Sequence, residues 1–537
     1  MQAFNKRISL KEIFLILFVV ILVSFYTGSL RTGSPLHHMG DSGQNYKVLY
    51  NIYEEGYPLN DLWPSLYKYV FEDKISANHD IDFYENDFKI NYEEIDKRKF
   101  NHFYFHAYFV TYLLSFFLLF LEASFALNFL NCLSFFSLLG CSYLLLRKNN
   151  FNYYESIAIV VGLSMYPGWT QSFFGQPFFD SLFRIGSFIT LYLLFYVIYD
   201  VKQEKKVSSI TQWKNISFLV ISTLFCISIV EKVSFYLFLT LLVFLVFYYK
   251  NINTRYKYTL LILSFLSIFY FIIISKLVLI NPYYESSAKI SIDTFINFFN
   301  NPFMLQQTGF FLIALLPFLL IIMFGRIRNA IFFLIILSPN IFHTIGGAEK
   351  TGFYTHYHSL YLGFLFFFVV EALSDLRKKR FLNKLRTILL ILVVIFYYLF
   401  VNVTSLGVEL KFNRQNFFNQ LSKVFVTRNI NYEIEKSIYS ILPDRNSKIV
   451  VTEKPMPHLY TYKNLTFFPY NLEESDYIIF NYSFVSDEKL PYLLLPHKNY
   501  DDQIEIREIL LNKIKKFYDY DKPLYDQHNL LILKKIN

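Results

Sequence analysis

The segment FYFHAYFVTYLLSFFLLFL, residues 103–121, decides how this chain is folded. A helix needs about 20 mainly apolar residues to cross a membrane, and this segment is long enough. If it crosses, the sequence predicts twelve spans. If it lies along the membrane surface, the sequence predicts eleven, and everything after it faces the opposite side.

Apolar runs of membrane length recur through the first three quarters of the sequence. The chain has 537 residues, of which 54% are hydrophobic and only 17% charged. A soluble domain carries about 25% charged residues. We therefore predict a mostly α polytopic membrane protein. The eleven predicted spans are 10–28, 124–146, 154–170, 178–199, 215–230, 233–249, 258–280, 303–324, 329–345, 358–374 and 386–403.

The distribution of basic residues decides between eleven and twelve spans, because short cytoplasmic loops are rich in Lys and Arg. With eleven spans and the N-terminus inside, twenty Lys and Arg fall in inner segments, against three in short outer loops, namely Lys232, Lys289 and Lys350. A span at 103–121 would reverse nearly all of this. We therefore predict that 103–121 is a helix lying on, or dipping into, the outer leaflet.

The N-terminus and the cysteines fit this interpretation. Lys6, Arg7 and Lys11 precede IFLILFVVILVSFYTG (13–28), which has no small-residue cleavage site and predicts a retained signal anchor in the cytoplasmic membrane. The three cysteines fall in apolar runs and predict small buried side chains. The net charge of +9 follows from membrane orientation and does not indicate nucleic acid as a partner.

Two large regions then face outward, the loop 29–102 and the tail after residue 403. We divide the chain into a membrane domain, 1–403, and an extracytoplasmic α/β domain, 404–537. The tail shows no phosphate-binding glycine loop and no metal-ligand spacing. Its predicted strands are 447–453, 465–468, 475–481 and 529–535, and its predicted helix is 502–518.

Asp41 is the first candidate for chemistry. It lies in HHMGDSGQNYKVLYN (37–51), between Gly40 and Gly43. A carboxylate at the outer membrane edge can act as a general base, and the glycines would let the backbone bend and a substrate approach. The alternative is a turn or helix N-cap aspartate.

Other candidates come from four more outward segments. His102 and His106 are four residues apart and would share a helix face, to hold a phosphate, relay a proton or supply two ligands to a metal; the alternative is interfacial anchoring. Gln176, Asp180 and Arg184 lie in 168–186, where Arg184 would pair with Asp180 or hold a lipid phosphate. Glu231 and Lys232 lie in a predicted tight outer turn between two spans, and the alternative is a surface pair that ends both helices. The last candidates lie in 346–361, where the alternative is a solvated loop; they are Lys350, His356, Tyr357 and His358.

These residues, in this order, resemble the GT-C type of membrane glycosyltransferase, such as the aminoarabinose, protein-mannosyl and oligosaccharyl transferases. The closer resemblance is to a large prokaryotic family of predicted membrane proteins of unassigned function allied to that class. The family's first-loop pattern is similar to DSGQNYKVLYN, which keeps Asp41, Gly43 and Asn51. The most specific similarity lies in the tail, through Pro457, His458, Leu459, Pro469, Asp476 and Tyr477.

The chain departs from the family pattern at several positions. Tyr46 and Lys47 replace an acidic residue and a glutamine, and Val230 and Lys232 flank Glu231 in place of Lys and Asp. FFGQPFFD (173–180) lacks the expected histidine. If these positions bind donor or metal, this chain handles a different substrate or is less active.

The resemblance implies transfer of a sugar from a polyprenyl-phosphate donor to a glycan, lipid or protein acceptor at the outer face of the cytoplasmic membrane. Arg184, Lys232, Lys350 and the histidines would hold the phosphate, and Asp41 would deprotonate the acceptor hydroxyl. Glu231, His356 and His358 would shape the acceptor side. No cofactor is firmly implied, and a divalent metal stays open. Two rival functions remain, a transporter or lipid flippase, and a non-catalytic envelope scaffold.

Overall fold

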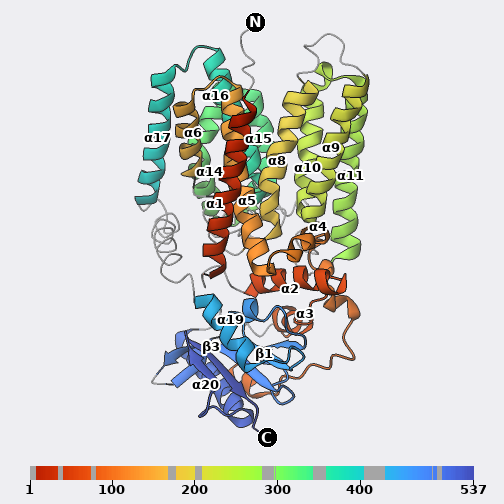
Figure 1. Cartoon of the computed structure of the whole chain (residues 1–537), viewed down its shortest axis with the longest axis vertical. Helices are drawn as coiled ribbons and strands as arrows, with labels where there is room; N and C mark the ends of the chain where they lie inside the picture. Colours follow the sequence, from red (N-terminus) through yellow and green to blue (C-terminus); the bar gives the residue numbers. More distant parts are fainter. Residues whose placement is uncertain are drawn as a thin grey trace. The chain divides into compact units, whose positions relative to one another are not determined.

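The computed structural model describes most of the chain, in two compact units (Figure 1). The described residues are 8–33, 40–73, 80–166, 168, 177–199, 209–280, 296, 298–342, 358–403, 430–485, 488–492 and 499–536. The first unit comprises residues 1–29, 106–110 and 127–422, and the second comprises 30–105, 111–126 and 423–537. The second unit therefore joins most of the predicted outer loop with the tail, although the sequence assigned that loop to the membrane domain.

The first unit is a bundle of apolar helices. Eight helical segments within the described residues are long and apolar enough to cross a membrane, so the chain is a membrane-embedded, multi-pass protein. These segments are α1 (Leu10–Gly33), α5 (Ala123–Lys148), α8 with its flanking turns (Phe179–Tyr199), α9 (Ser209–Ile229), α10 with η10 (Glu231–Asn251), α11 with η11 (Thr254–Val278), most of α14 (Pro302–Gly325) and α16 (Ser359–Lys378).

The other three predicted spans also contain helices. α6 (Tyr153–Ser164) and α15 (Ile327–Ile341) are shorter than a full crossing, and α17 covers Lys384–Val403. At a rise of about 1.5 Å per residue, α6 alone covers about 18 Å of a hydrocarbon layer about 30 Å thick. Eight of the eleven predicted spans thus coincide with the segments that are both long and apolar enough to cross within the described residues.

The segment 103–121 is not one helix. It contains η5 (His102–Tyr104), a non-helical stretch, α4 (Val110–Leu114) and η6 (Ser115–Leu119). The apolar helical piece Val110–Leu119 is too short to cross a bilayer. This length agrees with the prediction that 103–121 is not a span, but the continuous helix we expected is not formed.

Helix ends in the first unit are fixed by polar caps and close crossings. Asn152 and Glu155 form a reciprocal capping box at the start of α6, and the Glu155 carboxylate also accepts from Arg377 at 3.0 Å. α16 is almost wholly buried, and Gly363 lets it approach the backbone of α8. Cys132 and Cys226 are buried, as predicted, whereas Cys141 is only partly buried.

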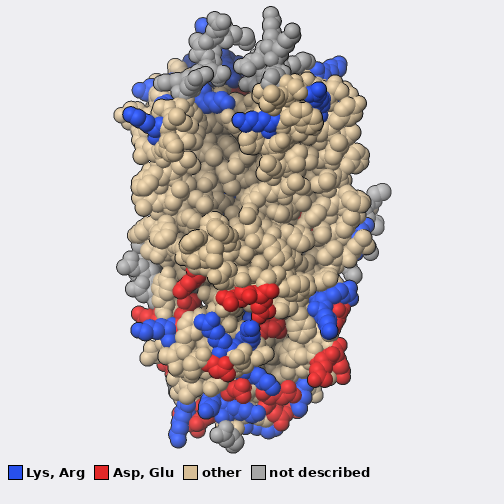
Figure 2. Space-filling view, turned by 45° about the vertical axis from the view of Figure 1, so that its right-hand side comes forward, with Lys and Arg blue, Asp and Glu red and all other residues tan. Residues whose placement is uncertain are grey.

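Basic side chains gather at one end of this bundle. Figure 2 shows Lys and Arg at the upper end of the helical part, next to a long surface with few charges. The ends that meet there are connected by contacts such as Arg326 with Asp375, at 3.1 Å. The helices α8, α10 and α16 begin at the opposite end of the bundle (Figure 1).

The second unit is built on a mixed sheet with strand order β2-β1-β3-β6-β5. β1 is parallel to β2 and β3, whereas β6 is antiparallel to β3 and β5, and β4 pairs with the far half of β3. α19 (Ile430–Ile441) and α20 (Tyr500–Phe517) accompany the sheet (Figure 1). The strands are β1 (Ile449–Val451), β2 (Leu465–Phe467), β3 (Tyr477–Val485), β4 (Glu488–Pro491), β5 (Tyr525–Gln527) and β6 (Leu530–Lys534). All four predicted strands and the predicted helix are confirmed.

The loop before residue 105 is folded against this sheet. Its helical segments are α2 (Gly40–Glu55), α3 (Trp63–Tyr67), η2 (Lys68–Glu72), η3 (Ile81–Glu85) and η4 (Lys97–Phe100). Asp61 and Ser65 accept hydrogen bonds from the backbone of Leu465 and Phe467, at 2.9 and 2.8 Å. These side chains satisfy the outer edge of β2, which would otherwise be open to pairing with another strand.

Candidate functional site

The candidate site in the first unit lies at the end of the bundle away from the basic residues. Glu231, Lys232, Asp180 and Arg184 are all almost completely buried there. Buried charges in an apolar bundle are costly, and they persist where they are paired or functional. The alternative of a surface pair for Glu231 and Lys232 is therefore wrong, because both side chains are buried.

Glu231 is the best-defined member of this cluster. It is the first residue of α10, directly after Val230, and both of its carboxylate oxygens are engaged. One lies 3.2 Å from His106 Nδ1, and the other accepts from the backbone N–H of Ala107 at 3.0 Å. Because the carboxylate faces Nδ1, His106 Nε2 lies on the far side of the ring. A carboxylate that orients an imidazole in this way suits proton transfer.

Arg184 is the second fixed group. It is the second residue of α8 itself (Phe183–Tyr192), and its guanidinium lies between α5 and α16. Nε donates to Ser359 Oγ at 3.1 Å and one terminal nitrogen to the Asn131 carbonyl at 3.5 Å. Gly363 is needed close by, because a Cβ there would collide with the Arg184 carbonyl oxygen. The guanidinium is thus held by neutral groups from two helices.

His358 lies at the N-cap position of α16, next to Ser359. Its Nδ1 shares a 2.5 Å hydrogen bond with the Tyr361 hydroxyl, which lies 2.7 Å from the Tyr166 hydroxyl. His358 is fully buried. The histidine predicted in an outer loop is therefore part of a buried polar chain inside the bundle.

The two parts of the cluster are linked by aromatic rings. The His106 ring lies 5.3 Å from Tyr108, and Tyr108 lies 4.9 Å from Phe179, the neighbour of Asp180. α8, α10 and α16 all begin at this end, so three positive helix dipole ends accompany Arg184 and Lys232. Such a site favours an anionic group, and it also contains carboxylates that can take up a proton.

His102 has a different environment from His106. In the second unit, the Trp63 indole N–H donates to His102 Nδ1 at 2.7 Å, and the Trp63 ring stacks on Phe105 at 3.8 Å. His102 is buried in this packing. The two histidines do not share a helix face, because residues 105–109 are not helical.

Asp41 is the second residue of α2, so it is part of a helix and not of a β-turn or loop. Its side chain is outside the described part of the structure. Gly43 does not serve as a bend. A Cβ on it would lie 2.7 Å from the backbone nitrogen of Pro457, so α2 packs directly on the segment 456–458. The two stretches that carry the sequence resemblance therefore meet, for a packing reason.

Two departures from the family pattern are also explained by packing in the second unit. Lys47 Nζ lies 2.8 Å from Asp61 Oδ1 and donates to the Tyr462 carbonyl at 2.5 Å. Tyr46 is fully buried, with its ring 6.0 Å from that of Tyr460. In this chain both positions tie α2 to the sheet domain.

The remaining candidates are Gln176, Lys350, His356 and Tyr357, and all four lie outside the described residues. In the described ranges, no group of three or more His, Cys, Asp or Glu side chains is arranged to hold a metal ion. The sequence analysis missed Asn131 and Ser359. Asn128, Asn131 and Ser134 recur at helical spacing within an apolar run and are all buried, so this polar stripe was a usable signal.

The sequence matches no protein-family model, and no curated protein matches it.

Proposed function

We propose that this protein is a GT-C-like membrane glycosyltransferase that moves a sugar from a polyprenyl-phosphate donor to an acceptor. The observation that carries the proposal is the buried polar cluster at one end of the bundle, where Arg184 and the Glu231–His106 pair are held between helices. In this proposal the cluster faces the extracytoplasmic side of the cytoplasmic membrane. The basic end of the bundle would then be cytoplasmic.

The roles follow from the chemistry of each group. Arg184 and Lys232, with the N-terminal ends of α8, α10 and α16, hold the lipid phosphate and stabilise it as it leaves. Glu231 orients His106 for proton transfer from the acceptor hydroxyl. Asp41 is the second proposed base, from its place in the sequence. Lys350, His356 and Tyr357 are proposed to bind substrate on the same grounds.

A binding experiment tests the phosphate role. The full chain in lipid nanodiscs is titrated with undecaprenyl phosphate and, in parallel, with the alcohol undecaprenol, which lacks the phosphate. We expect Arg184→Gln to weaken binding of the phosphate about tenfold or more, because a hydrogen bond between charged groups is lost. Binding of the alcohol should be weak and unchanged.

The matched control is Arg255→Gln, which removes an exposed arginine at the basic end of α11. It should leave phosphate binding intact. Equal loss in both variants, or no preference for the phosphate over the alcohol, would reject the proposed site. A thermal melt of each variant shows whether Arg184→Gln is still folded.

Turnover separates the enzyme from its rivals. With a polyprenyl-phosphate hexose as donor, Glu231→Gln should bind the lipid normally but release polyprenyl phosphate more than a hundredfold more slowly, because general acid–base catalysis contributes about 10²–10⁴-fold.

A flippase is the second candidate, favoured by Pro317 within α14 and Pro339 within α15. It would move the lipid between leaflets without cleaving it, and a scaffold would do neither.

A further inference from the structure

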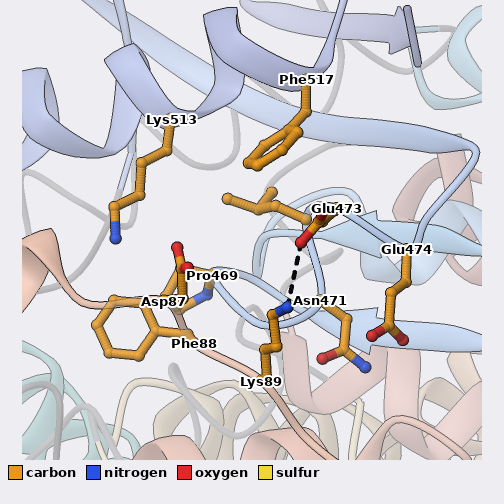
Figure 3. Close-up of a pocket in the computed structure, with 10 residues that line it drawn as sticks. Asp87, Phe88, Lys89, Pro469, Asn471, Glu473, Glu474, Lys513 and Phe517 are labelled. Carbon is orange, nitrogen blue, oxygen red and sulfur yellow. Dashed lines mark hydrogen bonds and ion pairs between the residues drawn. The ribbon is translucent and has the colours of Figure 1, made fainter. Parts of the chain in front are cut away.

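A shallow pocket opens on the surface of the second unit. Its lining residues are distant in sequence from Arg184 and Glu231. It lies between residues 87–89, the segment 469–474 and the C-terminal part of α20 (Figure 3). Together with the solvent at its mouth it holds about 360 Å³.

The pocket has an apolar floor. Pro469 and Leu472 are buried residues of its lining, and Phe517 projects toward it from α20 (Figure 3). Phe88 lies on the opposite side, with the Lys513 ammonium 5.1 Å from its ring centroid. The Lys516 ammonium lies 5.1 Å from the Phe517 ring centroid, so one face of each ring is covered and a ligand can use only the other face.

The rim of the pocket is polar and well fixed. Asn471 uses its whole amide group on Ile90, accepting from the backbone N–H at 2.8 Å and donating to the carbonyl at 3.1 Å. Lys89 and Glu473 form a 3.1 Å ion pair beside the cavity. These contacts join the loop before residue 105 to the tail, so both chain regions build the pocket.

The charges of the rim restrict the ligand. Asp87, Glu473 and Glu474 contribute three carboxylates, against the two ammonium groups of Lys89 and Lys513. Glu473 is paired, whereas the Asp87 and Glu474 carboxylates form no ion pair within the described residues. The lining is therefore negative on balance, which disfavours a phosphate or another anion.

We propose that this pocket binds a neutral sugar unit. A sugar ring has an apolar face that can pack on Phe517 and hydroxyl groups that can donate to the Asp87 and Glu474 carboxylates. The role of the pocket as a docking site for a glycan acceptor rests on the proposed function, whereas its affinity for sugar does not. It would hold the acceptor by a unit that does not react.

Saturation-transfer NMR on the full chain in nanodiscs tests this. The probes are the methyl glycosides of glucose, mannose and N-acetylglucosamine, with glucose 6-phosphate as the anionic comparison. We expect transfer to at least one neutral glycoside and at least a fivefold lower signal with glucose 6-phosphate. Glu474→Gln and Phe517→Ala should each reduce the neutral signal at least fivefold.

Glu508→Gln is the control, because Glu508 is exposed on α20 and does not line the pocket. Its signal should equal that of the unmodified protein. Glu474→Gln keeps the shape of the pocket, so the test does not depend on whether Phe517→Ala folds. Absence of transfer from every neutral glycoside, equal signals in Glu474→Gln and Glu508→Gln, or stronger transfer to glucose 6-phosphate would each overturn the proposal.

The same samples separate this proposal from the proposed function. If the Phe517→Ala chain loses the sugar signal but still binds undecaprenyl phosphate, the pocket is confirmed as a separate site. If Arg184→Gln leaves lipid binding unchanged while the sugar signal stays at the pocket, the proposed function fails and the sugar site stands.

Discussion

Gly43 shows how one residue can carry the packing of a whole helix. Because a Cβ at this position would meet the backbone of Met456 and Pro457 at 2.7–2.8 Å, Gly43→Ala must push α2 away from that segment. We expect a loss of about 1–3 kcal/mol in the free energy of unfolding of the second unit, as for other overpacked sites. Chemical denaturation followed by intrinsic fluorescence measures it.

Glu54→Ala is the control for this prediction, since Glu54 lies on the exposed side of α2. It should change stability by less than about 0.5 kcal/mol. If Gly43→Ala is as stable as Glu54→Ala, the close approach of α2 to Pro457 is wrong.

Asp526 gives a pH-dependent prediction at the same scale. Burial raises the pKa of its carboxyl group, but hydrogen bonds from Lys489 and from the Tyr482 hydroxyl outweigh burial and hold the pKa below its ordinary value of 3.8. Stability from a lowered carboxyl pKa is present above the unfolded pKa and is lost as the pH falls through the folded pKa. The pair therefore stabilises the sheet at neutral pH.

We expect Asp526→Asn to destabilise the protein at pH 7 by roughly 1 kcal/mol or less, because the pair is partly exposed. Thermal melts at pH 7 and pH 3 should show that this difference shrinks in acid. A difference that grows as the pH falls would contradict the assigned direction of the pKa shift.

At the scale of elements, the crossing of α8 and α16 controls the candidate site. A Cβ on Gly363 would collide with the Arg184 carbonyl and the Ser187 hydroxyl, so Gly363→Ala must separate the two helices. We expect a loss of roughly 3 kcal/mol and weaker binding of undecaprenyl phosphate, because Arg184 and Ser359 move apart. Thermal unfolding and the nanodisc titration measure the two effects.

Gly309→Ala is the matched control, a glycine-to-alanine change inside α14 where nothing lies within 4 Å of the added Cβ. It should be neutral or stabilising by up to about 1 kcal/mol, since alanine favours helix. Equal destabilisation by both changes would show that the α8–α16 crossing is not the cause.

The elements also show how much the sequence could predict. β1, β3 and β6 were predicted because short β-branched and aromatic runs lie between turn residues. α2 was missed, because GDSGQNYKVLYN begins with turn-forming residues and its helical face is revealed only by its packing on Pro457. β5 has only three residues, which is too short for an alternating apolar pattern to predict a strand, yet it pairs with β6.

The candidate site was predicted only where it depends on local sequence. Glu231 and Arg184 were found because charges interrupt apolar runs, and both are buried. The pairing of Glu231 with His106 joins residues 125 positions apart, so no local pattern could predict it. For the same reason the Asn131 contribution was missed, although its polar stripe was visible.

At the scale of the whole molecule, two distant chain regions form one unit. Residues 30–105 precede most of the membrane helices and residues 423–537 follow them, yet they fold together around one sheet. Both must therefore lie on the same side of the membrane. The apolar helical piece Val110–Leu119 within the segment 103–121 is shorter than a full crossing.

The side on which this unit lies is the last prediction. Because Lys and Arg gather at one end of the bundle, we expect that end in the cytoplasm and the sheet unit outside. Single cysteines at Glu508, in α20, and at Lys257, in the basic end of α11, report the two sides when the native cysteines are replaced by serine. In intact cells a membrane-impermeant maleimide should label E508C, and it should label K257C only after permeabilisation. The reverse pattern would place the Arg184 cluster on the cytoplasmic side and would reject transfer at the outer face.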